Sequence, residues 1–199
     1  MNDKVLLSYS TINNYYLSPH SYYNKLMGIE TPETEPMREG KKAHAIFQDH
    51  VIGIKKDERL KDFDWSFQKK EYHCRKDFSE KYQFHGYCDA VSFESKTFLE
   101  LKTVTKESSV WSQGKFHAIM QPRYYSWVTG LKKCLFVSCT FDFKNIKCYS
   151  CEFDADDWHK AQEWAEEAAR RIDVGDFYSD LVDGKCQGCS YKELCYFSP

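Results

Sequence analysis

The chain has 199 residues, of which 42% are hydrophobic and 17% aromatic, and its formal net charge is −2. A chain of this length suits one domain with a real core, and its composition excludes a disordered or collagen-like protein. The slightly negative charge gives no general attraction for nucleic acid, so DNA binding would depend on local basic clusters or on bound cations.

The N-terminal quarter is predicted to be mostly helical. Ser8 or Ser10 can cap a first helix that Pro19 ends, because serine satisfies free N–H groups and proline cannot continue a helix. Residues 31–36, with the sequence TPETEP, read as a loop. Apolar residues recur at helical spacing over residues 37–52, which predicts a second helix.

The middle of the chain changes to a strand pattern. Residues 67–75, 82–93 and 97–103 are rich in aromatic and β-branched side chains, and a polar Glu-Ser-Lys turn precedes the last of them. We expect these three segments to be neighbouring strands. Residues 114–129 follow with a helical pattern.

In the last third of the chain, the sequence pattern predicts a hairpin followed by a long helix. Strands over residues 135–143 and 146–153 flank a turn at Lys144–Asn145. Asp154 or Asp156 can cap the helix, which should end at Gly175.

Helices before, between and after strands predict an α/β fold, an α+β sandwich in which helices flank a mixed sheet. We expect a single domain over residues 1–199, made of an N-terminal helix and loop (1–36), a core (37–175) and a cysteine-rich C-terminal segment (176–199).

Asp89, Glu100 and Lys102 are the sharpest candidates for a catalytic site. Residues two apart in a strand share a face, so Glu100 and Lys102 point the same way while Leu101 faces the core. A turn centred on the bond before Ser95 places Asp89 opposite Glu100, and one centred on the bond after it places Asp89 opposite Lys102. Both registers bring the three side chains together, whereas a turn centred on Ser95 itself would not, so the prediction requires a two-residue loop or a compensating bulge.

These residue types suit phosphodiester hydrolysis. Two converging carboxylates repel unless a cation lies between them, and oxygen ligands suit Mg²⁺ or Mn²⁺. Such a cation polarises a phosphoryl oxygen and activates water, while a lysine orients that water or stabilises the developing charge. An isolated Glu-Leu-Lys is more often an exposed strand edge with an ion pair, so the surrounding residues decide the interpretation.

Four short motifs in order resemble the PD-(D/E)XK nuclease superfamily, specifically its RecB-like branch, which includes the CRISPR-adaptation nucleases and many phage exonucleases. The resemblance covers about two-thirds of the chain and implies a restriction-endonuclease-like fold. The matching segments are Gly40-x3-His44, Gly86-x2-Asp89, Glu100-Leu101-Lys102 and Gln121-x3-Tyr125.

The resemblance assigns roles to these positions. It implies that His44 is a metal ligand together with Asp89, Glu100 and the main-chain carbonyl of Leu101, and that Lys102 is catalytic. Gln121 and Tyr125 would support the metal centre or contact DNA. One departure from the family pattern is Pro122, directly after Gln121, which can start or kink the helix there.

Nine cysteines raise a second metal question. No segment has the apolar run of a membrane span or a secretory signal, so we expect a cytoplasmic protein, in the host cytoplasm if viral, whose cysteines are thiols or metal ligands. Cys186-x2-Cys189-x5-Cys195 resembles the C-terminal part of the iron-sulfur motif of RecB-like nucleases. Serine, as Ser18, stands where the family's fourth cysteine would be.

Three hypotheses therefore remain for this cysteine segment: a cluster held by three cysteines with Ser18 or another group, a zinc ion held with His20, or free thiols. A zinc ribbon that also uses Cys148 and Cys151 is disfavoured, because residues three apart in a strand face opposite ways. The remaining cysteines are predicted to be small buried residues: Cys74, Cys88, Cys134 and Cys139.

The leading functional hypothesis is a metal-dependent DNA nuclease, an exonuclease acting on single-stranded DNA or duplex ends with a partner protein in recombination or processing, because the resemblance implies it. One alternative is a non-catalytic nucleic-acid-binding or protein-binding module that keeps the fold. Another is a zinc-ribbon scaffold in which the cysteines are the function and the acidic residues are incidental.

Overall fold

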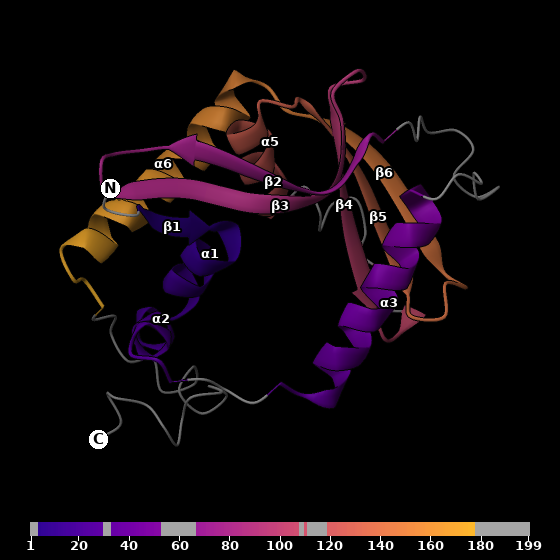
Figure 1. Ribbon diagram of the computed structural model, residues 1–199, viewed down its shortest axis with the longest axis horizontal. Coiled ribbons are helices and arrows are strands. Elements are labelled where there is room, and N and C mark those ends of the chain that lie inside the picture. The colour runs from indigo at the N-terminus through magenta and orange to yellow at the C-terminus, as the bar shows by residue number, and fades with distance from the viewer. Residues whose placement is uncertain (1–3, 30–32, 53–66, 108–109, 111–118, 178–199) are drawn as a thin grey trace.

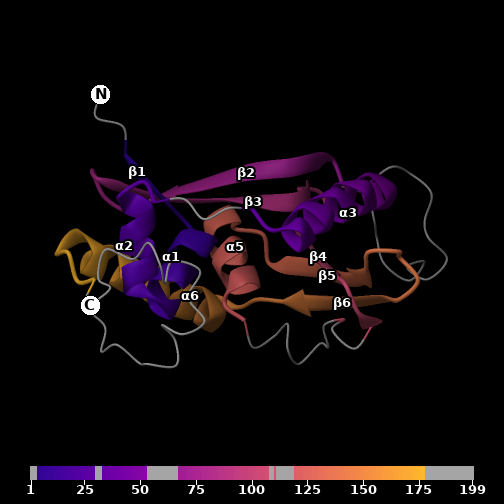
Figure 2. The ribbon, with the colours of Figure 1, turned by 90° about the horizontal axis from the view of Figure 1, so that it is seen from below.

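A computed structural model of the protein describes residues 4–29, 33–52, 67–107, 110 and 119–177. Within these ranges, six strands form one mixed sheet and helices lie on both of its faces (Figures 1 and 2), as the sequence predicted. None of the helices in these ranges is long and apolar enough to cross a lipid bilayer.

The N-terminal region contains one strand and three helices, of which the strand and the second helix were not predicted. Ser8 caps the first helix, because its hydroxyl accepts a hydrogen bond from the Thr11 N–H. Pro19 begins a second helix at once, where the sequence predicted only an end, because proline fits the first helical turn and Ser18 caps it. The elements are β1 (Val5–Ser8), α1 (Tyr9–Leu17), α2 (Pro19–Leu26) and α3 (Glu35–Ile52).

The strands and helices of the core follow the predicted order. Helix α3 begins two residues earlier than expected. Of the helix predicted over residues 114–129, residues 114–118 lie outside the described ranges, residues 119 and 120 are not helical, and α5 begins at Gln121. Pro122 occupies the first turn of that helix and therefore starts it rather than kinking it. The elements are β2 (Lys69–Asp77), β3 (Tyr82–Ser92), β4 (Thr97–Val104), α5 (Gln121–Thr129), β5 (Lys133–Thr140), β6 (Ile146–Glu152) and α6 (Ala155–Asp173).

The β3–β4 turn settles the register on which the acidic site depends. Ala90 pairs with Leu99, so the turn is centred on the bond before Ser95, one of the two registers that the sequence allowed. Continuing that register by one residue places Asp89 across from Glu100. The connection itself spans four residues, 93–96, rather than the expected two, and an even number keeps the same face.

The β5–β6 hairpin is confirmed, but its predicted turn is wrong. Cys139 pairs with Ile146, which centres the connection between Asp142 and Phe143 instead of at Lys144–Asn145. Phe143 has φ of 58°, and the Asp142 carboxylate accepts a hydrogen bond from the Thr140 hydroxyl at 2.6 Å. A side chain therefore stabilises a longer loop than dipeptide preferences alone predict.

Strand β3 has an open edge at its centre. Along one edge it pairs with β2, and along the other it pairs first with β1, over Tyr82–His85, and then with β4, over Ala90–Ser92. In the described ranges, no strand pairs with Gly86–Asp89 on that second edge. Figure 1 shows β1 and β4 diverging from β3 around this segment.

Two hydrophobic clusters pack the opposite faces of the sheet. The larger contains Phe84 and Phe98 with residues of α1, α5 and α6, and it is rich in aromatic rings. The smaller joins Phe47 of α3 to the other side of β4, at Leu99 and Leu101. Alternation along β4 thus directs neighbouring residues to opposite faces, so Glu100 lies on the face of Phe98 and the larger cluster.

Candidate active site

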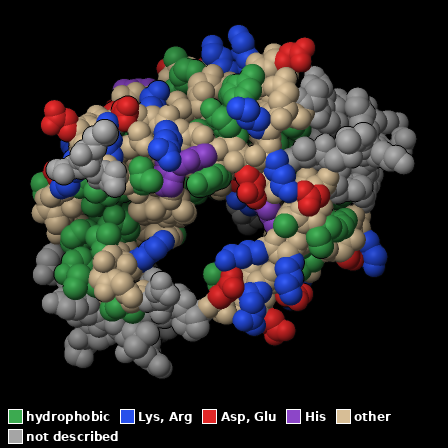
Figure 3. Space-filling model, viewed as in Figure 1, with side chains coloured by type: hydrophobic (Ala, Val, Ile, Leu, Met, Phe, Trp, Pro, Cys, Tyr) green, Lys and Arg blue, Asp and Glu red, His purple; other side chains and the backbone are tan. Residues whose placement is uncertain are grey.

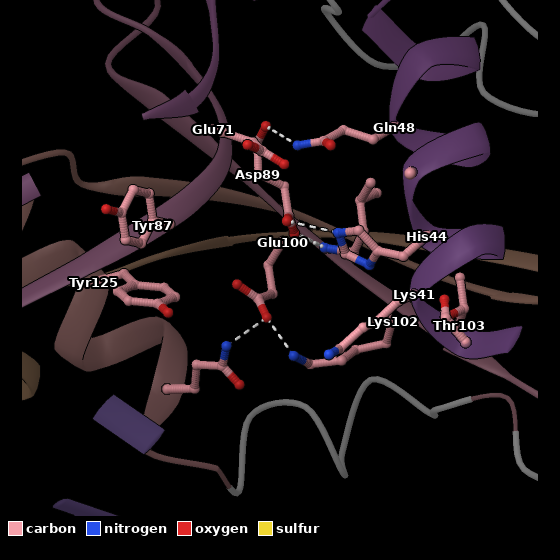
Figure 4. Close-up of a pocket in the computed structure, with 14 residues that line it drawn as sticks. Lys41, His44, Gln48, Glu71, Tyr87, Asp89, Glu100, Lys102, Thr103 and Tyr125 are labelled. Atoms are coloured by element: carbon pink, nitrogen blue, oxygen red, sulfur yellow. Dashed lines mark hydrogen bonds and ion pairs between the residues drawn. The ribbon is translucent and has the colours of Figure 1, made fainter. Parts of the chain in front are cut away.

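A cavity of about 540 Å³ lies at the open edge of β3. Its walls come from five elements, α3, β2, β3, β4 and α5 (Figure 4). The cavity brings together all the predicted site residues outside the cysteine segment: His44, Asp89, Glu100, Leu101, Lys102, Gln121 and Tyr125.

Hydrogen bonds from two neighbouring elements hold Asp89 in place. Its carboxylate accepts a hydrogen bond from the Leu101 main-chain N–H at 2.6 Å, in the position where a strand partner would otherwise be. Its main-chain carbonyl accepts one from the amide of Gln48 at 2.7 Å. The β2–β3 ladder is interrupted at this point, where Glu71 has φ of 47°. The interruption directs Asp89 into the cavity.

The His44 imidazole contacts Asp89 directly. His44 Nε2 lies 2.8 Å from Asp89 Oδ1, and one turn of α3 further on Gln48 supports the same residue. This hydrogen bond to Asp89 raises the pKa of His44, although burial acts to lower it. The pair therefore combines a carboxylate and an imidazole at one point of the cavity wall.

Glu100 is the most deeply buried acid of the site. It is 2% exposed, and its Oε1 accepts hydrogen bonds from Lys102 Nζ at 2.5 Å and from Gln121 Nε2 at 2.6 Å. Burial is the main reason that the pKa of Glu100 is raised to about 7, with repulsion from Asp89 adding to it and Lys102 opposing it. Keeping Glu100 ionised in this buried position therefore costs free energy.

Lys102 and Tyr125 keep their protons. Burial acts to lower the pKa of Lys102, but the Glu100 carboxylate outweighs it and raises this pKa. Burial, together with the charge of Glu100, raises the pKa of Tyr125. The cavity therefore offers the Lys102 ammonium and the neutral Tyr125 phenol beside the acids.

The Tyr125 ring explains the glycine at position 86. A Cβ atom added to Gly86 would lie 2.4 Å from Tyr125 Cε1, a distance that real side chains do not tolerate. Tyr125 therefore packs directly on the open segment of β3. Two of the sequence motifs, Gly86-x2-Asp89 and Gln121-x3-Tyr125, meet at this contact.

Several lining residues were not predicted from the sequence. Gln48 could have been found, because it follows His44 by four residues and thus shares its face of the helix. Tyr87 and Glu71 also line the cavity, on β3 and β2. Glu71 lies at the interruption of the ladder and Tyr87 pairs regularly with His73, and the sequence carries no simple signal that either would line the cavity.

The carboxylate and imidazole groups of the cavity suit a hard divalent cation, although they do not point at one common position. In the part of the chain that the structure describes, no three His, Cys, Asp or Glu side chains form a metal cluster, because Glu100 is turned toward Lys102 and Gln121. Two carboxylates and an imidazole nevertheless line one cavity, and the raised pKa of Glu100 reflects burial and repulsion that a cation would relieve.

The cysteine predictions divide into two groups. Cys186, Cys189 and Cys195 lie outside the described residues. Ser18, at the expected fourth position, uses its hydroxyl to accept a hydrogen bond from the Ser21 N–H as the cap of α2.

The other cysteines agree with the sequence. Cys151 belongs to the larger cluster and Cys148 packs against the smaller one, so the two face opposite sides of the sheet and cannot together form half of a zinc ribbon. The four cysteines predicted to be buried are buried: Cys74, Cys88, Cys134 and Cys139.

Comparison with solved structures supports the fold. A putative exonuclease from Eubacterium rectale superposes with a TM-score of 0.59 at 13% identity, over 92% of this chain and 88% of that one. The alkaline exonuclease LHK-Exo from Laribacter hongkongensis, solved with dAMP, gives 0.58 at 12% identity, over 85% and 88%.

A phage-related exonuclease from Haemophilus somnus gives a TM-score of 0.55 at 10% identity, over 85% of this chain and 83% of that one. The sequence matches no protein-family model and no curated protein. At these identities the likeness concerns the fold, and the fold of this chain is one that exonucleases share.

Proposed function

We propose that this chain is a metal-dependent deoxyribonuclease, an exonuclease that hydrolyses phosphodiester bonds at DNA ends in recombination, repair or processing. The observation that carries the proposal is the buried Glu100–Lys102 pair beside Asp89 and His44 in one cavity. The exonuclease fold of the structural neighbours supports it, and so does the order of the four sequence motifs.

His44, Asp89, Glu100 and the carbonyl of Leu101 are the groups that would hold Mg²⁺ or Mn²⁺. A bound cation of this kind supplies polarisation of a phosphoryl oxygen and a more acidic bound water. Asp89 is already fixed by the Leu101 N–H, and Gln48 fixes its main chain, so little reorganisation is needed on that side. Glu100 would exchange one of its present contacts for the cation.

Lys102 is the group that we assign to the developing negative charge of the phosphate. Its ammonium is held beside Glu100 and is largely shielded from water, where an electrostatic interaction is stronger than in bulk solvent. Gln121 donates to the same carboxylate oxygen and orients it. Tyr125 remains protonated and can donate a hydrogen bond toward the cavity.

A nuclease assay tests the proposal. End-labelled single-stranded, duplex and circular DNA would be incubated with the protein in Mg²⁺, in Mn²⁺ and in EDTA. We expect degradation of linear DNA with either metal, none in EDTA, and little action on circles. Lys102→Ala should lower the rate by about 10²- to 10³-fold or more, since it removes a charged donor from the site.

The control variant is Lys160→Ala, which removes an exposed lysine from α6, outside the cavity lining. It should cleave like the wild type. A wild-type protein that binds DNA but cleaves no form of it with either metal would contradict the catalytic proposal and favour a binding module.

The C-terminal cysteines carry a separate proposal. We infer that Cys186, Cys189 and Cys195 hold either an iron-sulfur cluster or Zn²⁺, because thiolates at this spacing suit both. Elemental analysis of anaerobically purified protein separates iron from zinc. A protein with neither metal would leave the segment as free thiols.

A further inference from the structure

A row of ring side chains extends from the cavity along β2 and β3. His73 lies across the ladder from Tyr87, and their rings stack with centroids 4.4 Å apart and planes 10° from parallel. His85, two residues before Tyr87, places its Nδ1 3.3 Å from His73 Nε2. The three rings therefore form one contiguous surface, which we call the ring platform.

The ring platform begins at the catalytic cavity. Tyr87 lines the cavity and precedes Asp89 by two residues on the same strand, a separation of about 6.6 Å. In Figure 4, the Tyr87 ring stands beside the cavity near Tyr125, on the side away from α3. In Figure 3, histidine side chains gather beside the hollow at the centre of this face.

Exposure distinguishes Tyr87 from the other large rings of β3. Tyr87 is 56% exposed, whereas Phe84 is 1% exposed and Tyr82 is 5% exposed. One side of the Tyr87 ring is supported by His73, so the ring is held in place without being covered. A rigid, exposed aromatic surface loses little conformational entropy when a flat ligand stacks on it.

Neutral rings and one nearby cation suit the ring platform to a nucleic-acid strand, although the acidic residue Glu71 lies at its cavity end. Burial lowers the pKa of both His73 and His85, and Arg75 adds to the effect, so both rings are neutral at pH 7 and suited to stacking. Arg75 lies across the ladder from His85 and is exposed, which places a cation at the far end of the row. Phosphates can therefore be neutralised there while bases meet the rings.

We infer that the ring platform binds the base of an unpaired nucleotide next to the scissile phosphate, with Tyr87 as the stacking residue. This inference rests on the proposed nuclease function and specifies its substrate: a DNA end whose terminal nucleotides are single-stranded. In a duplex, every base except those of the terminal pair has both faces covered by its neighbours and is held by its partner, so a fully paired end gains less from this surface than a single strand does. Stacking tolerates any base, so no sequence preference is expected.

Binding in EDTA tests the inference without cleavage. The dissociation constant of a fluorescent single-stranded oligonucleotide would be measured by anisotropy for the wild type, Tyr87→Ala and Tyr87→Phe. We expect Tyr87→Ala to weaken binding roughly 5- to 100-fold, the loss of one stacked base, and Tyr87→Phe to retain it. Affinity for a blunt duplex should change much less.

Two controls separate stacking from general damage. Phe93→Ala removes another exposed ring, 44% exposed and outside the cavity lining, and should leave binding unchanged. An abasic site at the bound terminal position should weaken binding by the wild type but not further weaken binding by Tyr87→Ala. Urea unfolding of each variant verifies that it is folded.

The outcomes distinguish this inference from the proposed function. If the wild type cleaves DNA and Tyr87→Ala binds single strands equally well, the ring platform is wrong and the nuclease proposal stands. An equal loss of affinity for single strands and blunt duplexes would also overturn stacking. A wild type that neither binds nor cleaves DNA would overturn both.

Discussion

Strand β3 differs sharply between its two paired ends and its open centre. At the ends, Gln83–His85 and Ala90–Val91 have strand partners on both edges. In the described ranges, Gly86–Cys88 pair with β2 alone and Asp89 has no ladder partner, and Tyr87 and Asp89 line the cavity. Within one strand, the ends contribute to the core and the centre contributes to the site.

The comparison shows what opening a sheet requires. The Asp89 carboxylate takes the place of a missing strand partner for the Leu101 N–H, so the backbone remains hydrogen-bonded. The neighbouring Glu100 is removed from water, and this burial raises its pKa. The centre of β3 is irregularly paired and its regularly paired ends stabilise it. This pattern is expected where the needs of a functional site compete with stability.

The largest effect on stability should come from a paired end. Phe84→Ala removes a ring that is 1% exposed from the larger cluster, and such truncations cost about 3–5 kcal/mol. Tyr87→Ala, three residues further along the same strand, should change the free energy of unfolding far less. Urea denaturation of both variants measures the difference. Equal losses would mean that the centre of β3 contributes to the core after all.

The next effect concerns the buried charge at the centre. In metal-free protein, the pKa of Glu100 is about 7 against an ordinary value of 4.5, so the folded state binds this proton more tightly than the unfolded state. The associated stability is fully present below pH 4.5 and is lost as the pH rises toward 7, on the order of 3 kcal/mol.

Glu100→Gln removes this titration. Urea denaturation in EDTA from pH 4.5 to 8 should show that the wild type loses more stability than Glu100→Gln as the pH rises. Adding Mg²⁺ at pH 7.5 should restore stability to the wild type more than to the variant. Parallel curves for the two proteins would show that Glu100 is not penalised by burial.

A smaller effect is expected from the contact between Gly86 and Tyr125. Gly86→Ala forces a methyl group against the ring, and overpacking of this kind costs about 1–3 kcal/mol. The loss should disappear in a Tyr125→Ala background, which a double-mutant cycle would reveal. Gly40→Ala is the matched control, because its added Cβ would meet Phe141 at an ordinary 3.5 Å. A similar loss for Gly40→Ala would contradict this explanation.

Local patterns predicted most of the fold because they depend on neighbouring residues. Alternation identified β3 and β4, and the parity of their turn left only two registers that assemble the acids. Strand β1 escaped prediction because it has only four residues and pairs in parallel with a strand more than 70 residues away. Turn lengths escaped because Lys96 and Phe143 adopt positive φ, which their types do not indicate.

The residues of the site also divide into those that the sequence predicted and one that it did not. His44, Asp89, Glu100 and Lys102 were placed by motif order, and the structure brings them into one cavity. Tyr87 was not placed, because its exposure follows from where β1 leaves β3 and from nothing in its own neighbourhood.

The smallest predicted effect tests where β1 ends. Ser8 is the last residue of β1 to pair with β3, and its hydroxyl caps α1, so the chain turns away there instead of continuing beside Gly86. Ser8→Ala should cost about 1 kcal/mol of unfolding free energy, as loss of an N-cap does. Ser18→Ala removes the cap of α2 and should cost a similar amount.

The two serine variants should nevertheless differ in cleavage. Ser8 is followed by Tyr9, whose pKa is raised mainly by burial and also responds to the charges of Lys102 and Glu100, so α1 begins beside the site. Loosening this end of α1 should lower the rate of DNA cleavage, whereas Ser18→Ala should leave it unchanged. If both variants are equally stable and cleave DNA at the same rate, the cavity does not depend on where β1 ends and α1 begins.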